Sequence, residues 1–425
     1  MIKKYLRKIL IKYLTISNTK KLIKSAIKLY NNNNKIEGDD GLIIFPCDPE
    51  SVTGSRGDEA MIQASITNFR QRHPNSTIYI VGQGQLASHF VDRSQLDSNL
   101  KFISTTNFSN LEELIKITSQ IKPKEAVVIG ADCIDGAYSP VLSITLIALF
   151  NILNKYGLKT RMTGFSFNAC PHKAVIRAVK KIGGNETYNV RDKYSHTRFK
   201  NITGAKCSLI ADAAFLLGPQ TDFNGFSKIK EWIDKKKAQH RTIIAFNLHP
   251  MLRKYNNPDE IKDDAVKVAE NIKILLAENP LVDLIFVPHD DRDRINDGVM
   301  LTAIYEMLLS SSYSERLFYD PIVPQAKNIK AVVALTDGLI SSRMHLAIAA
   351  LGSGVPVLGT DYQDKFPGLF VHFQLPNEFL LSANDFFSDK FIVVSKVFFK
   401  QLPELKRIIE QNIQEIHKLA QLNFE

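Results

Sequence analysis

The sequence predicts an α/β protein with two doubly wound domains, and three observations support this fold class. Short apolar segments, typical of buried strands, alternate with helical segments along most of the chain, which is the pattern of a parallel sheet covered by helices on both faces. A chain of 425 residues is too long for one compact core, so two domains of roughly 200 residues are expected. A polar, charged segment at 218–240 interrupts the alternation once and is therefore predicted as the linker.

The first domain is predicted over residues 41–217. Its opening segment, GLIIFPC at 41–47, is apolar throughout and predicts a buried strand. A Ser- and Gly-rich loop at 51–60 then leads into a helix. The same patterns predict strands at 76–84, 125–132, 159–168 and 186–192 and helices at 111–121, 141–157 and 172–183, with LIADAAFLL at 209–217 closing the domain.

The second domain is predicted over residues 241–390. Its expected elements are a strand at 241–250, a helix at 259–278, a strand at 281–289, a helix at 297–310, a strand at 330–336, a helix that starts near residue 343 and a strand at 355–360. Residues 391–425 follow, and 402–422 have the apolar spacing of one long amphipathic C-terminal helix. Each domain is thus expected to be Rossmann-like, with the carboxyl ends of the two sheets facing a central cleft, where such folds bind ligands.

Residues 1–36 are predicted to form a basic, amphipathic arm. They hold ten Lys and Arg residues and no acid, while the other 44 basic residues equal the 44 acidic ones, so the net charge of +10 belongs to the arm. Apolar residues occupy the other helix face, as in helices that lie on anionic lipid. The arm is expected either to contact an anionic membrane surface or to pack on the first domain as a helical hairpin. No nucleic-acid partner is expected, because the neutral body does not extend the basic patch.

The cysteine pattern and the hydropathy of the chain exclude several classes of protein. The four cysteines are scattered and form no Cys-x-x-Cys pair, which argues against a zinc site or a disulfide framework and fits a reducing cytoplasm. No run of about 18 consecutive apolar residues occurs, so no membrane-spanning helix is expected. We expect a cytoplasmic protein, which would be peripheral at the inner face of the cell membrane if the arm binds lipid rather than packing on the first domain.

Polar side chains follow the first domain's predicted strands, where a parallel sheet binds ligands. Asp58 lies in the loop GSRGDEA, whose glycines permit a tight turn with amides open to an anion or a sugar hydroxyl, and helix capping is an equal alternative. Asp132 and Asp135 follow the strand at 125–132 and either bind acceptor hydroxyls or cap the helix near Pro140.

Two further strand ends carry charged residues. Arg191 follows one strand of the first domain, where a guanidinium suits bidentate binding of carboxylate or phosphate, and an ion pair with Asp192 is the alternative. His289 ends an apolar strand of the second domain and precedes three acids, Asp290, Asp291 and Asp293. Adjacent acids point in different directions, so sugar binding or loop solvation is favoured over a metal ion there.

The stretch SSRMHLAIAALGSGVPVLG at 341–359 places an arginine and a histidine at the start of a predicted apolar helix. Its two serines are predicted N-caps, which places Arg343 and His345 in the first helical turn. Free amides and the helix dipole favour an anionic ligand there, and a histidine suits proton transfer near neutral pH. Tyr362 and Lys365 follow the next predicted strand and are expected at the same rim.

These motifs resemble those of the polysaccharide pyruvyl transferase family. The matching segments are GDEAM at 57–61, VRDKYS at 190–195, ADAAFLL at 211–217, VPHDDRD at 287–293 and, most specifically, SSRMHLAIAALGSGVPVLGTDYQDK at 341–365. In order and spacing the resemblance runs from about residue 41 to 370, so it covers most of the chain except its two ends.

The resemblance implies a fold like that of the GT-B glycosyltransferases and transfer of pyruvate from phosphoenolpyruvate to two hydroxyls of one sugar, which gives a cyclic ketal. The acceptor would be a sugar of a cell-surface polysaccharide or exopolysaccharide, or of its lipid-linked precursor. The resemblance implies that His345 is catalytic and that Arg191, Arg343 and Lys365 bind the donor. We assign the acceptor side to Asp58, Asp132, Asp135 and His289. No metal or cofactor is expected, since the cations already offset the charge of the donor.

Two other functions are weighed against this one. A GT-B glycosyltransferase that uses a nucleotide sugar would share the fold, but it typically needs a ribose-binding Glu, and none is evident near 341–365. A membrane-docked, sugar-binding scaffold protein would explain the arm, but it would not explain the Arg-x-His and Tyr-x-x-Lys pairs.

Overall fold

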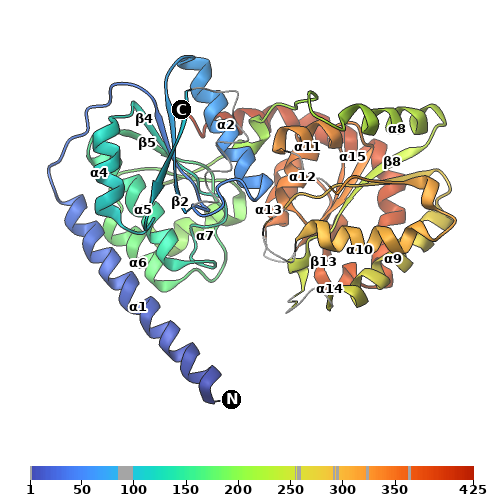
Figure 1. Ribbon diagram of the computed structural model, residues 1–425, viewed down its shortest axis with the longest axis horizontal. Coiled ribbons are helices and arrows are strands. Elements are labelled where there is room, and N and C mark those ends of the chain that lie inside the picture. Colours follow the sequence, from blue (N-terminus) through green and yellow to red (C-terminus); the bar gives the residue numbers. More distant parts are fainter. Residues whose placement is uncertain are drawn as a thin grey trace. The chain divides into compact units, whose positions relative to one another are not determined.

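The computed structural model describes residues 2–84, 99–253, 255, 260–290, 292, 296–321, 325–361 and 365–425, with the backbone alone for 2–13 and 251. The chain divides into two compact units, and each is an α/β unit (Figure 1). The first comprises Met1–Thr53, Met61–Ala213 and Leu419–Glu425, and the second comprises Gly54–Ala60 and Ala214–Lys418.

The first unit is built on a five-stranded parallel sheet with the order β3-β2-β1-β4-β5. Its strands are β1 (Leu42–Phe45), β2 (Ile78–Gln83), β3 (Leu100–Thr105), β4 (Glu125–Val128) and β5 (Lys159–Met162). A second parallel pair, β6 (Tyr188–Val190) and β7 (Cys207–Leu209), is linked to this sheet by bridges from Phe165 to Ala131 and to Val190. The central strand β1 is fully buried, as its apolar sequence predicts.

Helices cover this sheet: α1 (Ile2–Tyr30), α2 (Arg56–Arg72), α4 (Leu111–Ile121), α5 (Pro140–Lys155), α6 (Lys173–Ile182) and α7 (Lys193–Thr203). The apolar α5 is the central one, because all eleven residues from Ser143 to Leu153 are buried. The second half of α1 packs on α5 and α6 through Leu22, Ile23, Ala26 and Leu29. The arm is therefore one helix rather than a hairpin, and its second half is part of the first unit.

The second unit is built on a six-stranded parallel sheet with the order β10-β9-β8-β11-β12-β13. Its strands are β8 (Thr242–Asn247), β9 (Val282–Phe286), β10 (Leu317–Tyr319), β11 (Gly338–Ser341), β12 (Val357–Asp361) and β13 (Leu380–Ser382). Its helices are α8 (Phe226–Ala238), α9 (Ile261–Glu278), α10 (Asp297–Leu309), α11 (Ala326–Val333), α12 (Met344–Leu351), α13 (Phe366–Phe373), α14 (Ala383–Phe386) and α15 (Asp389–Gln421). Short 3-10 turns lie at Ala213–Leu216, Pro250–Leu252, Ser314–Arg316 and Asn377–Phe379.

The structure corrects one predicted element and extends others. Residues 330–336, predicted as a strand, form the end of α11 and the turn after it, and the strand of this repeat is β11. A short apolar run does not distinguish a buried helix from a buried strand, which is why the prediction was wrong. The segment 218–240 is not a bare linker, because it contains α8, which packs on β8 and α11. The short strands β3, β10 and β13 had no predicted counterpart.

Among the helices that the structure describes, none is long and apolar enough to cross a lipid bilayer. The four cysteines are all free thiols. Both units are Rossmann-like, as predicted, and the central cleft expected between them stays a prediction.

Candidate active site

Polar side chains gather at the carboxyl ends of four neighbouring strands of the second unit, β9, β8, β11 and β12. They are Asn247 and His249 at and after β8, His289 and Asp290 after β9, Ser341 to Arg343 at and after β11, and Asp361 and Lys365 at and after β12. Because the carboxyl ends of parallel strands meet at one edge of a sheet, residues that are distant in sequence converge there. This edge is the candidate active site.

Arg343 is fixed by two buried carboxylates. Its Nη2 donates to Oδ1 of Asp297 at 2.6 Å, its Nε donates to the same carboxylate at 3.0 and 3.1 Å, and its Nη1 lies 2.9 Å from Oδ2 of Asp290. Asp297 is fully buried at the start of α10 and also accepts from Asn247 Nδ2 at 2.9 Å. A guanidinium held at three nitrogens has one orientation, so Arg343 is preorganised.

The two carboxylates respond differently to their surroundings. Burial raises the pKa of Asp297, although the Arg343 charge opposes this rise. Burial also disfavours the charge of Asp290, but Arg343 and Arg292 outweigh it and hold the pKa of Asp290 down at about 2. Asp290 is therefore an anion at any ordinary pH, and much of the Arg343 charge is balanced inside the protein.

The first turn of α2 contacts two histidine-bearing segments of the same unit. Arg56 N donates to the His289 carbonyl at 3.4 Å, and Ser55 forms an antiparallel bridge with Asp290. At the next position, a Cβ atom on Gly57 would lie only 2.2 Å from Nδ1 of His345. Only glycine lets the backbone approach the imidazole this closely, so the GDEAM motif has a steric role beside His345.

His345 lies in the first turn of α12, as predicted, and is half-buried. The predicted serine caps are wrong, because Arg343 occupies the N-cap position without a side-chain cap. Ser341 Oγ instead accepts from Arg343 N at 2.9 Å, and Ser342 Oγ accepts from His249 N at 2.6 Å. Ser342 thus links the segment after β11 to the segment after β8.

Two other histidines of the cluster are buried and neutral. His249 and His289 are each 4% exposed. Burial lowers the pKa of each well below the ordinary value, and the nearby Arg343 charge lowers both further. The His345 and Arg56 charges also act on His289. A neutral imidazole offers one N–H donor and one acceptor, so these rings suit hydrogen bonding to hydroxyls rather than charge pairing.

Lys365 and Asp58 complete the part of the predicted site that lies in the second unit. The half-buried Lys365 follows β12, where its N donates to Asp361 Oδ1 at 3.1 Å, and its charge contributes to the lowered pKa of His249. Asp58 is buried in the first turn of α2, next to the glycine that contacts His345. The predicted Tyr362, Asp291 and Asp293 lie outside the described residues.

The other predicted site residues lie in the first unit. Arg191 is 2% exposed, and its Nη1 donates to Asp212 at 2.6 Å. Burial disfavours its charge, but Asp212 and Asp132 raise its pKa. Its described ion pair is with Asp212, while Asp192 caps α7 by accepting from Ser195 N at 2.8 Å and makes a smaller electrostatic contribution to the Arg191 pKa.

The two predicted acceptor aspartates of the first unit brace loops after β4. Asp135 accepts from Ala137 N at 2.8 Å and from Asn168 Nδ2 at 2.6 Å, and Asp132 accepts from the Tyr138 hydroxyl at 3.1 Å. Neither caps α5, whose N-cap is Ser139. The roles of Asp132, Asp135 and Arg191 towards substrate stay predictions.

Sequence reasoning thus selected Asp58, His289, Arg343, His345 and Lys365, which lie in one unit, but it had assigned Asp58 to the first domain. It missed Asn247, His249, Arg56 and Asp297. His249 follows a predicted strand in the sequence NLHP, so the strand-end rule that selected His289 would have found it. Asp297 carried no comparable signal, because its role depends on the long-range contact with Arg343.

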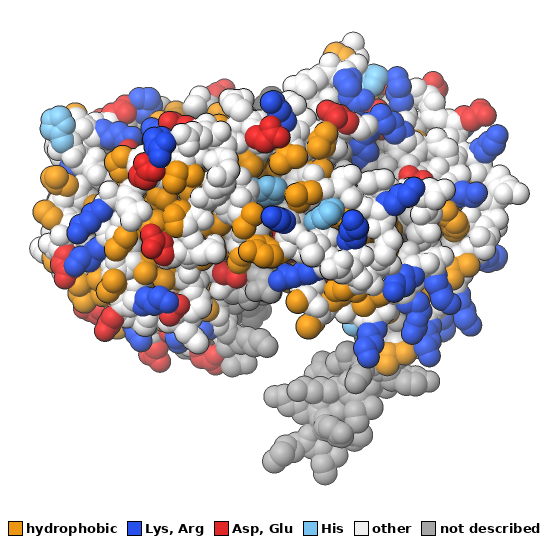
Figure 2. Space-filling view, turned by 180° about the vertical axis from the view of Figure 1, so that it is seen from behind, with side chains coloured by type: hydrophobic (Ala, Val, Ile, Leu, Met, Phe, Trp, Pro, Cys, Tyr) orange, Lys and Arg blue, Asp and Glu red, His pale blue; other side chains and the backbone are white. Residues whose placement is uncertain are grey.

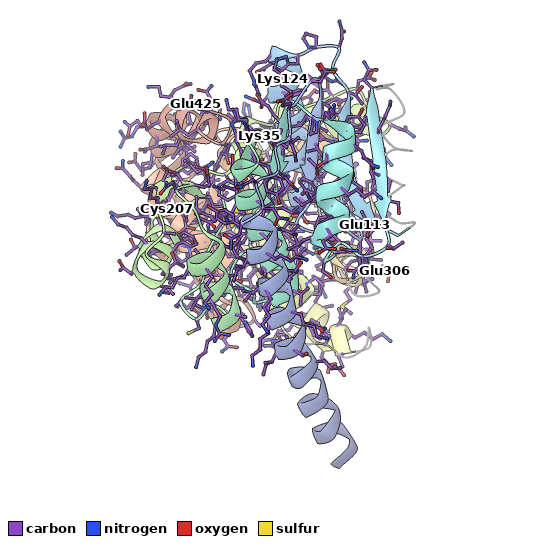
Figure 3. The ribbon with its side chains drawn as sticks, turned by 90° about the vertical axis from the view of Figure 1, so that its left-hand side faces the viewer. Lys35, Glu113, Lys124, Cys207, Glu306 and Glu425 are labelled. Carbon is purple, nitrogen blue, oxygen red and sulfur yellow. The ribbon has the colours of Figure 1, made fainter. Side chains whose placement is uncertain are left out.

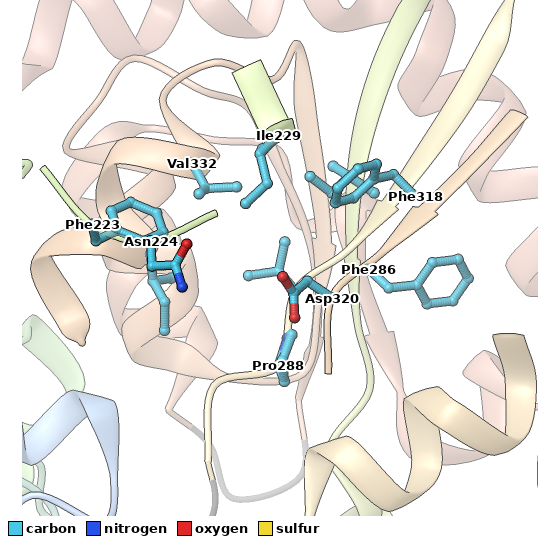
Figure 4. A pocket seen from close by; sticks show the side chains of 11 residues that line it. Phe223, Asn224, Ile229, Phe286, Pro288, Phe318, Asp320 and Val332 are labelled. Atoms are coloured by element: carbon cyan, nitrogen blue, oxygen red, sulfur yellow. The ribbon is translucent and has the colours of Figure 1, made fainter. Parts of the chain in front are cut away.

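A small apolar pocket of the second unit is a poorer candidate for an anionic ligand (Figure 4). Apolar side chains such as Phe223, Ile229 and Phe318 line it, with Asn224 and Asp320 as its polar members and no Lys, Arg or His among the described lining residues. Within the described parts of the chain, no three His, Cys, Asp or Glu residues are grouped as around a metal ion.

The family model of polysaccharide pyruvyl transferases matches residues 56–364, a span that contains His249, His289, Arg343 and His345 and well over half of the chain. The chain belongs to this family. No curated protein matches the sequence significantly.

Solved structures share the fold of this pyruvyl transferase family member. A UDP-N-acetylglucosamine 2-epimerase superposes with a TM-score of 0.53 at 12% identity, covering 92% of this chain and 95% of its own. UGT73P12 of Glycyrrhiza uralensis, complexed with glycyrrhetinic acid 3-O-monoglucuronide, superposes with a TM-score of 0.53 at 9% identity, covering 90% of this chain and 92% of its own. At such identities the likeness shows the fold, which is GT-B-like, and not the activity.

Proposed function

We propose that this protein transfers the pyruvyl group of phosphoenolpyruvate to two hydroxyls of one sugar and forms a cyclic pyruvate ketal. The acceptor is a sugar of a polysaccharide or of its lipid-linked precursor. The observation that carries the proposal is His345, which lies in the first turn of α12 beside the preorganised Arg343, inside the residues that the family model matches.

Binding of the donor rests on fixed cations. Phosphoenolpyruvate carries a phosphate and a carboxylate, and each requires charged donors in a defined geometry. We assign this task to Arg343 and Lys365, together with Arg191 of the first unit. Asp290 and Asp297 orient the Arg343 guanidinium before the donor arrives, so little side-chain entropy is lost on binding. The scheme uses no metal or other cofactor, which stays a prediction.

His345 acts as the general acid. Protonation of the methylene carbon makes the central carbon electrophilic, and the first sugar hydroxyl adds there. The carbon–oxygen bond to phosphate then breaks, and the second hydroxyl adds to close the ketal. The two hydroxyls lose two protons, of which one restores His345 and the other leaves with phosphate. A histidine suits both directions of proton transfer because its ordinary pKa lies near neutral pH.

We assign the acceptor hydroxyls to groups that carry no positive charge. Such groups can orient the hydroxyls without competing with the cations for the anionic donor. His289 stays neutral through burial and offers a donor and an acceptor, and Asp58 lies beside the glycine that touches His345. Asp132 and Asp135 are the proposed acceptor contacts of the first unit.

The deciding experiment supplies the protein with phosphoenolpyruvate and a panel of model and lipid-linked glycosides. We expect phosphate release and a pyruvate ketal detected by mass spectrometry. An active preparation that transfers sugar from a nucleotide donor and ignores phosphoenolpyruvate would show a glycosyltransferase instead, and sugar binding without turnover would show a scaffold protein.

A His345→Ala variant tests the acid separately. Loss of a general acid lowers kcat by about 10²- to 10⁴-fold, whereas His73→Ala, which removes a histidine outside the cluster, is expected to leave kcat unchanged. A His345→Ala variant with full turnover would remove the acid assignment and leave the pyruvyl transfer standing.

A further inference from the structure

Two helices of the first unit present lysines and arginines without any acid. In α1, Lys20, Lys21, Lys24 and Lys28 are exposed, opposite the buried Leu22, Ile23, Ala26 and Leu29. In α6, Lys173, Arg177, Lys180 and Lys181 are exposed, opposite the buried Ala174, Val175, Ala178, Val179 and Ile182. Neither helix contains Asp or Glu anywhere in its length.

These eight cations belong to one surface, because α1 packs directly against α6. The contact is continued by Tyr30 at the end of α1, whose hydroxyl approaches Gly184 just after α6. Figure 2 shows Lys and Arg side chains gathered on the first unit, at the lower right of that view. We call the surface made by these eight residues the basic face.

The charge of the basic face is not neutralised by the protein itself. None of its eight cations forms an ion pair with any of the described residues. On its other side α1 contacts α4, which carries Glu112 and Glu113. These acids lie at the edge of the basic face and not within it. Eight positive charges spread over two packed helices attract an extended anionic surface more strongly than they attract a small ion.

We propose that the basic face docks this protein on an anionic lipid surface, with α6 as well as α1 in contact with the headgroups. Apolar exposure on α1 favours lipid over nucleic acid as the partner. Leu14 is 48% exposed and Ile16 is 42% exposed, one turn before the first lysine of the face. Figure 3 shows α1 running across the first unit and continuing past it. Exposed aliphatic side chains flanked by lysines suit insertion at the headgroup boundary.

The part played by α6 is what the structure adds. The sequence assigned the whole excess charge to residues 1–36, and the body of the chain sums to neutral. The four cations of α6 are balanced in that sum by acids that lie elsewhere, so only the packing of α6 on α1 reveals a common face.

The test is vesicle flotation of the full-length protein at low and high salt. The vesicles are phosphatidylcholine alone or equal parts of phosphatidylcholine and phosphatidylglycerol. The decisive variant carries Lys173→Gln, Arg177→Gln, Lys180→Gln and Lys181→Gln. Each basic residue near an anionic surface strengthens partitioning about fivefold, so the variant should bind anionic vesicles about 600-fold more weakly if all four cations contact the headgroups and about 25-fold more weakly if two do. Wild-type binding should weaken with salt, because screening shortens the reach of charges.

A matched control carries the same loss of charge at four exposed lysines of the second unit, Lys235→Gln, Lys267→Gln, Lys400→Gln and Lys406→Gln. It should bind anionic vesicles as the wild type does. Wild-type binding by the α6 variant would overturn the proposal and leave α1 as the only contact. If both variants bound anionic vesicles equally weakly, the total charge of the protein, and not the basic face, would determine vesicle binding.

Two further arms separate lipid from other partners. Leu14→Ser with Ile16→Ser should weaken vesicle binding while leaving binding to duplex DNA unchanged. Lipid would be overturned as the partner by two results together. Duplex DNA would compete fully with vesicles for the wild type, and the serine variant would bind vesicles as the wild type does. Flotation needs no turnover, so its outcome is independent of the proposed pyruvyl transfer.

Discussion

The chemistry of single residues in the second unit is set by close contacts with residues distant in sequence. Gly57 is the sharpest case, because the backbone at this position touches the His345 ring. Arg343 is the second, since Asp290 and Asp297 engage its three guanidinium nitrogens. Substitution of Gly57 therefore tests the position of His345, and substitution of Arg343 tests the ion pairs separately.

Gly57→Ala should displace His345. The added Cβ would lie 2.2 Å from Nδ1, so the ring or the α2 turn must move. A displacement of this size lowers kcat by about a hundredfold, which steady-state kinetics would measure. Gly218→Ala is the control, because a Cβ there meets nothing within 4 Å. Wild-type kcat in the Gly57→Ala protein would show that the contact does not position the histidine.

Arg343→Lys should destabilise the second unit as well as impair donor binding. A lysine cannot reproduce the fork that engages both carboxylates, and a buried carboxylate left without its partner costs about 3 kcal/mol in the free energy of unfolding. Thermal or denaturant unfolding measures this loss, and His345→Gln serves as a comparison that should unfold like the wild type. If Arg343→Lys raised KM alone, with unchanged stability, the ion pairs would have no structural role.

At the scale of elements, the end of the chain holds backbone segments that lie next to Arg191. The residues after α15 fold onto the first unit, where Asn423 is fully buried. Its side chain accepts from Gly164 N at 2.7 Å and donates to Ala211 O at 2.9 Å. A Cβ on Gly164 would lie 3.0 Å from the Cβ of Arg191, so Asn423 braces the backbone beside that arginine.

Asn423→Ala should destabilise the first unit. It leaves a buried N–H and a buried carbonyl without partners, which costs about 2 kcal/mol for each group. Denaturant unfolding measures the loss, and Gln421→Ala, at an exposed neighbouring position, should have no effect. If Arg191 binds the donor, the KM for phosphoenolpyruvate should rise in the Asn423→Ala protein as well. Unchanged stability would mean that water replaces both hydrogen bonds.

At the scale of the whole molecule, stability in acid depends on buried carboxylates. Burial alone would raise the pKa of Glu125, at the start of β4, but Arg72 and Arg161 lower it to about 2. Arg72 Nη1 lies 2.6 Å and Arg161 Nη1 2.7 Å from this carboxylate. Because the folded-state pKa is below the ordinary value, the stabilisation is present above the ordinary pKa and is lost as the pH falls.

Glu125→Gln should therefore destabilise the protein by about 3 kcal/mol at neutral pH, because it removes the carboxylate that pairs with the buried Arg161. The difference from the wild type should shrink as the pH falls from 4.5 towards about 2. Denaturant unfolding across this range measures it, and Glu404→Gln, at a fully exposed pair with Arg407, is the control without effect. A pH-independent difference would show that packing, and not charge, is lost.

Much of the fold follows from local patterns in the sequence. The alternation of apolar strands and helices predicted both Rossmann-like units, and the apolar run that follows Ser341 and Ser342 predicted a helix with His345 in its first turn, although the serines do not cap it. Such features depend on residues adjacent in the chain, whose spacing sets burial and helix starts. The misassigned strand at 330–336 marks the limit, since a short apolar run fits either element when only neighbours are considered.

Only the tertiary structure decided how distant residues act on one another. It paired Arg343 with Asp297, placed Gly57 against His345, kept His249 and His289 neutral, and joined α6 to α1 in one basic face. Each of these depends on through-space distance and burial, which local periodicity does not encode. The sequence by itself therefore determined the fold class, the family and the position of the proposed acid, and the packing of distant segments determined its environment.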